Sequence, residues 1–182
     1  SVVIDVRSCH IHYIHTKSLL DEVTLNKVKT LLKYDNELDL SDPKSKLLNE
    51  LVQLDGDHQD SVDKLKSSLH SDTYLFRILP RPGTISPWSS KATNIMEVCG
   101  LGDKIERIER GTAVLIDVRP GFPLLEQLHN EQYASFASVY DRMTQTLFIN
   151  DSVPKYNDLF EEHEPKPLVH VDIISSKENL IK

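Results

Sequence analysis

The side chains best suited to binding or chemistry gather in one short segment, residues 79–94, which reads LPRPGTISPWSSKATN. The segment holds three prolines, the only tryptophan of the chain and four small hydroxyl residues around a predicted helix start. Two cations, Arg81 and Lys91, lie where the unpaired backbone N–H groups of that helix would attract an anion. One interpretation is a loop that faces a phosphate or a carboxylate. The other is a rigid connection whose hydroxyl groups cap the helix and whose cations pair with acids at a domain contact.

The residues that would form this interface or anion-facing loop have polar or aromatic side chains: Arg81, Thr84, Ser86, Trp88, Ser89, Ser90, Lys91, Thr93 and Asn94. They lie in a cationic part of the sequence. Residues 77–119 contain seven Lys and Arg against five Asp and Glu, so this part carries +2 while the remainder carries −9. We therefore expect a docking partner to contact this region.

A metal site would have to use residues near the start of the chain: Cys9, His10, His12 and His15. On a strand, His10 and His12 share a face while Cys9 points away, so at most two of these side chains converge. A structural zinc site needs four ligands, and ordinary strand histidines are the simpler interpretation. We expect Asp141, Arg142 and the acidic residues 161–164 to be surface charge.

Cys99 would be the candidate nucleophile, but it ends a predicted helix, where the helix dipole disfavours a thiolate. It also falls on the apolar stripe of that helix, which favours a buried structural cysteine. The sequence contains no phosphate-binding loop, dinucleotide fingerprint, nucleophile elbow or cysteine-rich metal spacing. We therefore expect no catalytic residue and no metal site in this chain.

The elements that must position these residues follow from apolar periodicity. Strands are predicted at residues 2–14, 72–80 and within 105–118, and helices at 20–34, 43–54, 89–99 and from 124. A phase change between Arg7 and His10 predicts a bulge in the first strand or a switch in its partner strand. Ser41-Asp42-Pro43 is expected to cap and begin the second helix, and Ser89 or Ser90 to cap the third. Apolar residues on both faces of 72–80 indicate a central strand, and residues 138–150 fit either a strand or a helix. The order of elements predicts an α+β fold, a small antiparallel sheet with helices on one face.

The composition excludes several classes of protein. The chain has 182 residues, a net charge of −7 and 39% hydrophobic residues, enough for one domain with a core of its own. The acidic balance argues against nucleic-acid binding, and no apolar run is long enough to span a membrane. Two cysteines, with no secretory signal, indicate a reducing compartment, so we expect a soluble cytoplasmic protein.

The motif RPGTISPWSSKATNI at residues 81–95 resembles the amino-terminal domain of the phosphoribosylformylglycinamidine synthase family, in its large single-chain form and especially in fungi. Further matches run in the same order along nearly the whole chain: residues 7–13, 72–75, 99–101, 107–111, 120–125, 140–148 and 164–169. The resemblance implies a PurS-like, ferredoxin-like pseudo-dimer over residues 1–160. It also implies that residues 161–182 begin a linker to a synthetase domain.

The resemblance implies an activity that belongs to the parent enzyme and not to this chain alone. That enzyme is an ATP-dependent ligase of purine synthesis, which converts formylglycinamide ribonucleotide (FGAR) and glutamine to formylglycinamidine ribonucleotide (FGAM). ATP and Mg²⁺ bind its synthetase domains, and a glutaminase domain releases ammonia. This domain would then dock those parts and support ammonia transfer. The alternative is a stand-alone module that binds a phosphorylated metabolite through the 81–94 loop.

The resemblance also bears on the ends of the sequence. Ser1 is not a methionine, and family members carry a further strand before this position. We therefore expect the sequence to be part of a longer chain.

Overall fold

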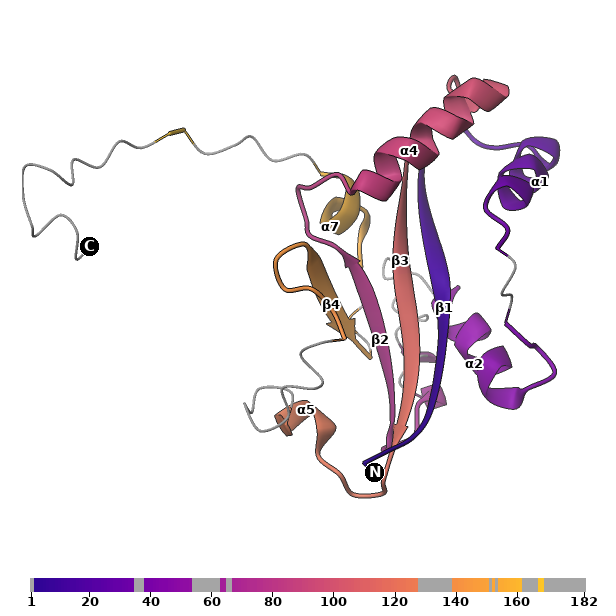
Figure 1. Cartoon of the computed structure of the whole chain (residues 1–182). Helices are drawn as coiled ribbons and strands as arrows, with labels where there is room; N and C mark the ends of the chain where they lie inside the picture. The colour runs from indigo at the N-terminus through magenta and orange to yellow at the C-terminus, as the bar shows by residue number, and fades with distance from the viewer. Residues whose placement is uncertain are drawn as a thin grey trace, which may run out of the picture.

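The computed structural model describes residues 2–34, 38–53, 63–64, 67–127, 139–150, 152, 154–161 and 167–168. Its centre is a four-stranded antiparallel sheet in the order β1-β3-β2-β4 (Figure 1). The strands are β1 (Val3–Thr16), β2 (Thr73–Pro80), β3 (Ile105–Val118) and β4 (Gln145–Ile149). The predicted α+β class is confirmed, and the segment that fitted either a strand or a helix contains β4. None of the described helices has the length and apolar character of a membrane span.

β1 runs without the bulge that the phase change predicted between Arg7 and His10. It pairs continuously with β3 from Asp5 to His15, and its register shifts lie only at the two ends. The alternation of apolar residues changes phase because the apolar side chains of the first half and of the second half of this unbroken strand lie on opposite faces of the sheet. Ile4 and Val6 are exposed on one face, whereas Ile11 is buried on the other.

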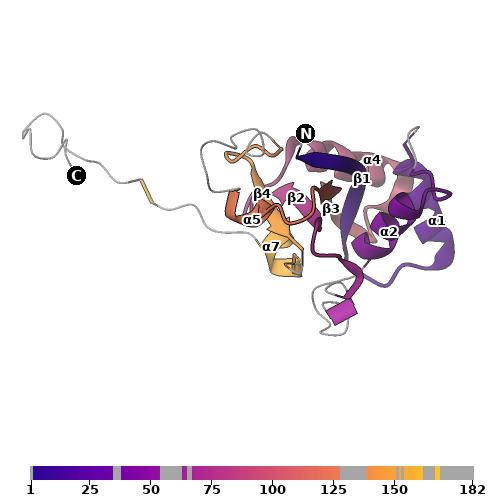
Figure 2. The same ribbon diagram turned by 90° about the horizontal axis from the view of Figure 1, so that it is seen from below.

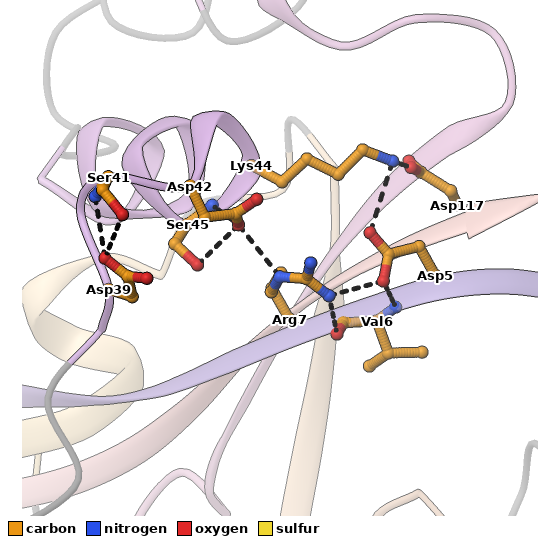
Figure 3. A network of polar contacts seen from close by, with 9 residues as sticks. All are labelled: Asp5, Val6, Arg7, Asp39, Ser41, Asp42, Lys44, Ser45 and Asp117. Carbon is orange, nitrogen blue, oxygen red and sulfur yellow. Dashed lines mark hydrogen bonds and ion pairs between the residues drawn. The ribbon is translucent and has the colours of Figure 1, made fainter.

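Helix α2 (Pro43–Val52) covers the face of the sheet that carries Ile11. The predicted cap is confirmed, because the Asp42 side chain accepts from the backbone N–H of Ser45 at 2.8 Å and Pro43 begins the helix. Arg7 of β1 donates to the same carboxylate at 3.0 Å, which ties the helix start to the sheet (Figure 3). The Ser45 N–H and then Arg7 lower the pKa of Asp42 to about 2.

The same face holds the largest core cluster. Leu48 and Leu51 of α2 pack on Leu75, Leu79, Ala113 and Leu115 of the central strands, together with Leu159 of the short helix α7 (Tyr156–Phe160). Buried aliphatic side chains of this kind stabilise a fold by roughly 1.5–3 kcal/mol each. The strand predicted from 72–80 is therefore central, as its apolar residues on both faces indicated.

Two further helices cover the opposite face, and Figure 2 shows α4 on the side of the sheet away from α2 and α7. Helix α4 (Pro87–Met96) packs Met96 on Ile108 of β3, and α5 (Leu124–Gln127) packs Leu124 on Phe76 and Ile116. The expected arrangement had helices on one face only, and the structure corrects this detail. Alternate residues of β2 and β3 are apolar on both faces, so each face needs cover.

Helix α1 (Glu22–Leu31) lies beside the free edge of β1 and is shorter at both ends than predicted. Its cap is Asp21, whose carboxylate accepts from the N–H of Thr24 at 2.7 Å and from Lys104 Nζ at 2.7 Å. Val28 is the buried residue of its apolar stripe and packs on Ile105 and Met96. The proposed boundary near residue 160 cannot be followed further, because most of 161–182 lies outside the described residues.

Candidate functional site

The segment 81–94 leads from β2 into α4, and its helix cap differs from the prediction. Ser86 is the N-cap, and its Oγ accepts from the N–H of Ser89 at 3.0 Å. Ser89 and Ser90, the predicted caps, lie inside the first turn because Pro87 occupies the first helical position. Three serines in this stretch have suitable chemistry for a cap, and Pro87 was the sequence signal for Ser86, as Pro43 is for Asp42.

A buried carboxylate holds this helix start in place. Glu109 of β3 is fully buried and accepts from Ser86 Oγ at 2.7 Å and from the Ser86 N–H at 3.2 Å. Arg107 pairs with Glu109 at 2.5 Å and also donates to the carbonyl of Thr84 at 2.6 Å. The backbone carbonyl of Thr84 and the N–H and hydroxyl of Ser86 therefore fix the loop on β3, while the Thr84 side chain stays exposed. This supports the rigid-connection interpretation for these two residues.

The other polar residues of the segment face outward or sideways. Arg81, Ser90, Lys91 and Asn94 are exposed. Arg81 also donates to the carbonyl of Met143 at 3.4 Å, near the turn before β4. The prolines and the Glu109 contacts hold the backbone between these side chains, so the exposed cations have a fixed placement.

Four of the predicted site residues line a cavity of about 530 Å³ beside α4. The lining comprises Ser89, Ser90, Thr93 and Asn94 from the predicted set, with His15, Ile85, Glu97, Glu106, Arg107 and Phe160. Ser89 is 1% exposed, and its hydroxyl has no hydrogen-bond partner among the described residues. Thr93 Oγ1 is already used, because it accepts from the N–H of Ile108 at 3.2 Å.

The charges around this cavity do not favour an anion. Two carboxylates, Glu97 and Glu106, face it with only one guanidinium, and that cation is paired with Glu109. Arg81 and Lys91 do not belong to its lining. A phosphate placed here would meet like charges before it met an unpaired cation.

Trp88 lies on the other flank of α4, in a cluster of rings. The guanidinium of Arg110 sits 4.9 Å from the centre of the Trp88 ring, within cation–π range. His12 lies 5.6 Å from the same ring, and its Nε2 is 3.0 Å from the hydroxyl of Tyr34. Burial, then the nearby His10 and Arg110, lowers the pKa of His12 to about 4, so its imidazole is neutral at pH 7.

The candidate metal ligands Cys9, His10, His12 and His15 all lie on β1. Within the described part of the chain, no group of three or more His, Cys, Asp or Glu side chains is placed to hold a metal ion. Burial raises the pKa of the Cys9 thiol to about 11, which keeps it protonated. Cys99 is half-buried, in the turn after α4 where Gly100 adopts a φ of 75°. Asp141 accepts hydrogen bonds within its own turn, and residues 162–164 lie outside the described residues.

Arg107 and Glu109 organise the site but were not predicted from the sequence. The available signal was their spacing, because charged residues two apart on a predicted strand share one face. Glu106 and Phe160 were not predicted either, and His15 was considered only as a metal ligand, because only the tertiary fold brings these three residues beside α4.

Comparisons with known proteins show what the chain is similar to. A sequence model of the family described as "Formylglycinamide ribonucleotide amidotransferase N-terminal" matches residues 9–160. A phosphoribosylformylglycinamidine synthase of Saccharomyces cerevisiae is 49% identical over 176 residues, which is 95% of this chain. The enzyme of the same name in Schizosaccharomyces pombe is 43% identical over 102 residues, or 56% of this chain.

These relatives are much longer than the sequence described here. The matched regions make up 12% of the Saccharomyces cerevisiae protein and 7% of the Schizosaccharomyces pombe protein. The relatives are single chains in which this domain is one small part.

Proposed function

This chain belongs to the formylglycinamide ribonucleotide amidotransferase N-terminal family, and we propose that it is the non-catalytic docking and coupling domain of such a synthase. The parent enzyme would convert FGAR, glutamine and ATP to FGAM in the cytoplasm. ATP and Mg²⁺ would bind its synthetase part, and a glutaminase part would release the ammonia. The observation that carries this proposal is the 49% identity to a phosphoribosylformylglycinamidine synthase over 95% of the chain.

The coupling role is supported by the way in which the 81–94 loop is built. The backbone carbonyl of Thr84 and the hydroxyl of Ser86 are held by Arg107 and Glu109. Its outer side presents two exposed cations, Arg81 and Lys91, on a chain whose net charge is −7. A rigid cationic edge of this kind suits contact with another domain, since its geometry is set before docking.

We propose that the exposed side of the 81–94 loop contacts the synthetase and glutaminase parts of the same polypeptide. Ammonia transfer needs those parts to stay aligned, because free ammonia would otherwise escape to solvent before it reacts. The domain would act by holding that alignment. Among the described residues, burial keeps the Cys9 thiol protonated, the Asp42 carboxylate caps α2 and the Glu109 carboxylate is paired with Arg107, so none of these three is poised for ligase or glutaminase chemistry.

The first test assays the purified chain for turnover. With FGAR, ATP, Mg²⁺ and either glutamine or ammonia supplied, we expect no FGAM and no glutamate above the background of a heat-treated sample. Glutamine hydrolysis or FGAM formation by this chain alone would contradict the proposal.

The alternative function, a stand-alone module for a phosphorylated metabolite, has a test of its own. The carboxylates of the cavity beside α4 argue against it. Calorimetric titration of the chain with FGAR should give no heat of binding. Saturable binding that is lost in Arg81→Ala/Lys91→Ala would favour the module over the coupling role.

A further inference from the structure

The cavity of about 530 Å³ beside α4 collects hydrogen-bond acceptors. Glu97, at the end of α4, and Glu106, near the start of β3, line it, and both residues are exposed. Glu97 has no hydrogen bond or ion pair to another described residue. The Nε2 of His15 lies 3.6 Å from Glu106 Oε2, which is longer than a hydrogen bond. Both carboxylates therefore keep oxygen atoms that can accept from a bound group.

The cations around this cavity do not balance these two carboxylates. Among the described residues of its lining, Arg107 is the only arginine and there is no lysine. The charge of Arg107 is balanced by the buried Glu109, which accepts from its Nε and Nη2, and Nη2 also donates to the carbonyl of Thr84. The charges of Glu97 and Glu106 therefore favour a positively charged ligand.

A buried hydroxyl group is a second and independent sign of a ligand here. Ser89 lines the cavity from the first turn of α4, is 1% exposed, and its hydroxyl has no partner among the described residues. Its neighbour Thr93 is already used, because Thr93 Oγ1 accepts from the N–H of Ile108. A buried hydroxyl without a partner is costly, and a bound donor would satisfy it.

The size and the walls of the cavity indicate an organic cation and not a metal ion. Small-molecule sites have volumes of about 300–1,000 Å³, a range that includes this cavity. Ile85, which is 55% exposed, and Phe160 of α7 add apolar side chains to the lining. Within the described residues, His15, Glu97 and Glu106 do not form a group that could hold a metal. A cationic head on an aliphatic stem matches carboxylates beside apolar walls.

We propose that this cavity binds a guanidinium group carried on an aliphatic stem. The guanidinium donates to the carboxylates of Glu97 and Glu106 and to the buried hydroxyl of Ser89. The stem packs on Ile85 and Phe160. A guanidinium suits the cavity better than an ammonium group, because it presents five N–H donors in a planar fork that matches carboxylate oxygens.

Two sources supply this chemistry: a free metabolite with a guanidinium group, or an arginine side chain from another part of the parent polypeptide. They differ in one measurable respect. An arginine of the synthase fills the cavity in the complete enzyme and keeps a soluble guanidinium compound out. A site for a free metabolite stays open to such a compound in the complete enzyme.

The test follows the two carboxylates in the complete synthase. Carbodiimide with glycine ethyl ester labels accessible carboxylates, and mass spectrometry measures the labelling of Glu97 and Glu106. The probe is butylguanidine, which has a guanidinium head and no amine that would react. For a free metabolite, we expect saturating butylguanidine to lower the labelling of both residues at least threefold. Glu50 of α2 and Glu126 of α5 are exposed control sites whose labelling should not respond to the probe.

An arginine of the synthase gives a different labelling pattern. Glu97 and Glu106 are then protected in the complete synthase before the probe is added, and butylguanidine protects them only in the 182-residue chain. If butylguanidine protects the two residues in neither protein, or protects Glu50 and Glu126 to the same extent, the proposal is overturned.

Calorimetric titration of the chain with butylguanidine tests the individual contacts. Glu97→Gln/Glu106→Gln should weaken binding about tenfold, whereas the control Glu50→Gln/Glu126→Gln, with the same change of charge, should not. Ser89→Ala should also weaken binding, and thermal unfolding should show it at least as stable as the parent chain, because its hydroxyl has no partner. Equal affinity of the two double variants would contradict the proposal. These readouts do not depend on the coupling role, because none of them involves ammonia transfer or FGAM formation.

Discussion

The guanidinium of Arg77 donates a hydrogen bond of 3.1 Å to the backbone carbonyl of Leu51, at the end of α2. Its other terminal nitrogen donates to the carbonyl of Asn150 at 3.1 Å, just after β4. Arg77 is 1% exposed, so burial lowers its pKa below the ordinary value for an arginine. One side chain of the central strand thus joins α2 to the far edge of the sheet.

Replacing Arg77 should destabilise the fold through the carbonyl groups it leaves behind. Arg77→Ala removes both donors and opens a cavity, and we expect a loss of about 3–5 kcal/mol in the free energy of unfolding. Arg77→Met keeps most of the volume, so its smaller loss separates packing from hydrogen bonding. Urea unfolding measures both. A loss below about 1 kcal/mol for Arg77→Ala would contradict the bridging role.

Gly111 should not tolerate a side chain. A Cβ at this position would collide with Leu79 Cδ2 and would lie 2.8 Å from the carbonyl oxygen of Ile78, because β2 approaches β3 closely here. We expect Gly111→Ala to cost about 1–3 kcal/mol by thermal unfolding. Thr112→Ala, at the next residue of β3, is the control. The close approach would be refuted if Gly111→Ala were as stable as the parent chain.

The loop that starts α4 depends on Glu109. Glu109→Gln leaves the guanidinium of Arg107 without its carboxylate, and we expect a loss of about 3 kcal/mol. Ser86→Ala removes the helix cap and should cost about 1 kcal/mol. The exposed Ser90→Ala is the control, expected within about 0.5 kcal/mol of the parent chain. If all three variants had the same free energy of unfolding, Glu109 would not anchor the loop.

Acid should weaken the fold partly through His12. Its pKa is about 4 when folded, against an ordinary value of 6.5 when unfolded. Between these values the unfolded chain binds a proton that the folded chain does not, so stability falls as the pH drops from about 6.5 to 4. His12→Gln should flatten the pH dependence of the unfolding free energy in that window. An unchanged slope in the variant would show that His12 is not buried as described.

Local signals in the sequence predicted much of this fold. Asp42 and Pro43 correctly predicted the start of α2. The apolar residues on both faces of β2 correctly predicted that it is a central strand of the sheet. The predicted bulge in β1 was wrong because Val6 and Ile11 serve opposite faces of one strand, and period-2 patterning assumes that one face is buried.

The site was predicted less completely, for reasons that lie in tertiary contacts. The contact of Glu109 with Ser86 joins residues 23 apart and follows no local pattern, whereas Pro87 was a local signal for Ser86 as the cap that the prediction did not use.

The proposed coupling role predicts that the 81–94 loop is needed to link glutamine hydrolysis to FGAM formation, and this can be measured in the complete synthase. Arg81→Ala/Lys91→Ala removes two exposed cations from the rigid edge of the 81–94 loop, and Lys29→Ala/Lys46→Ala removes two exposed cations elsewhere as a control of equal charge. The measurement is the amount of glutamate released per FGAM formed, alongside the ammonia-dependent rate of FGAM formation. We expect the loop variant alone to release excess glutamate while its ammonia-dependent rate is kept. A glutamate-to-FGAM ratio unchanged from the parent enzyme, or an equal loss of both rates, would contradict the account.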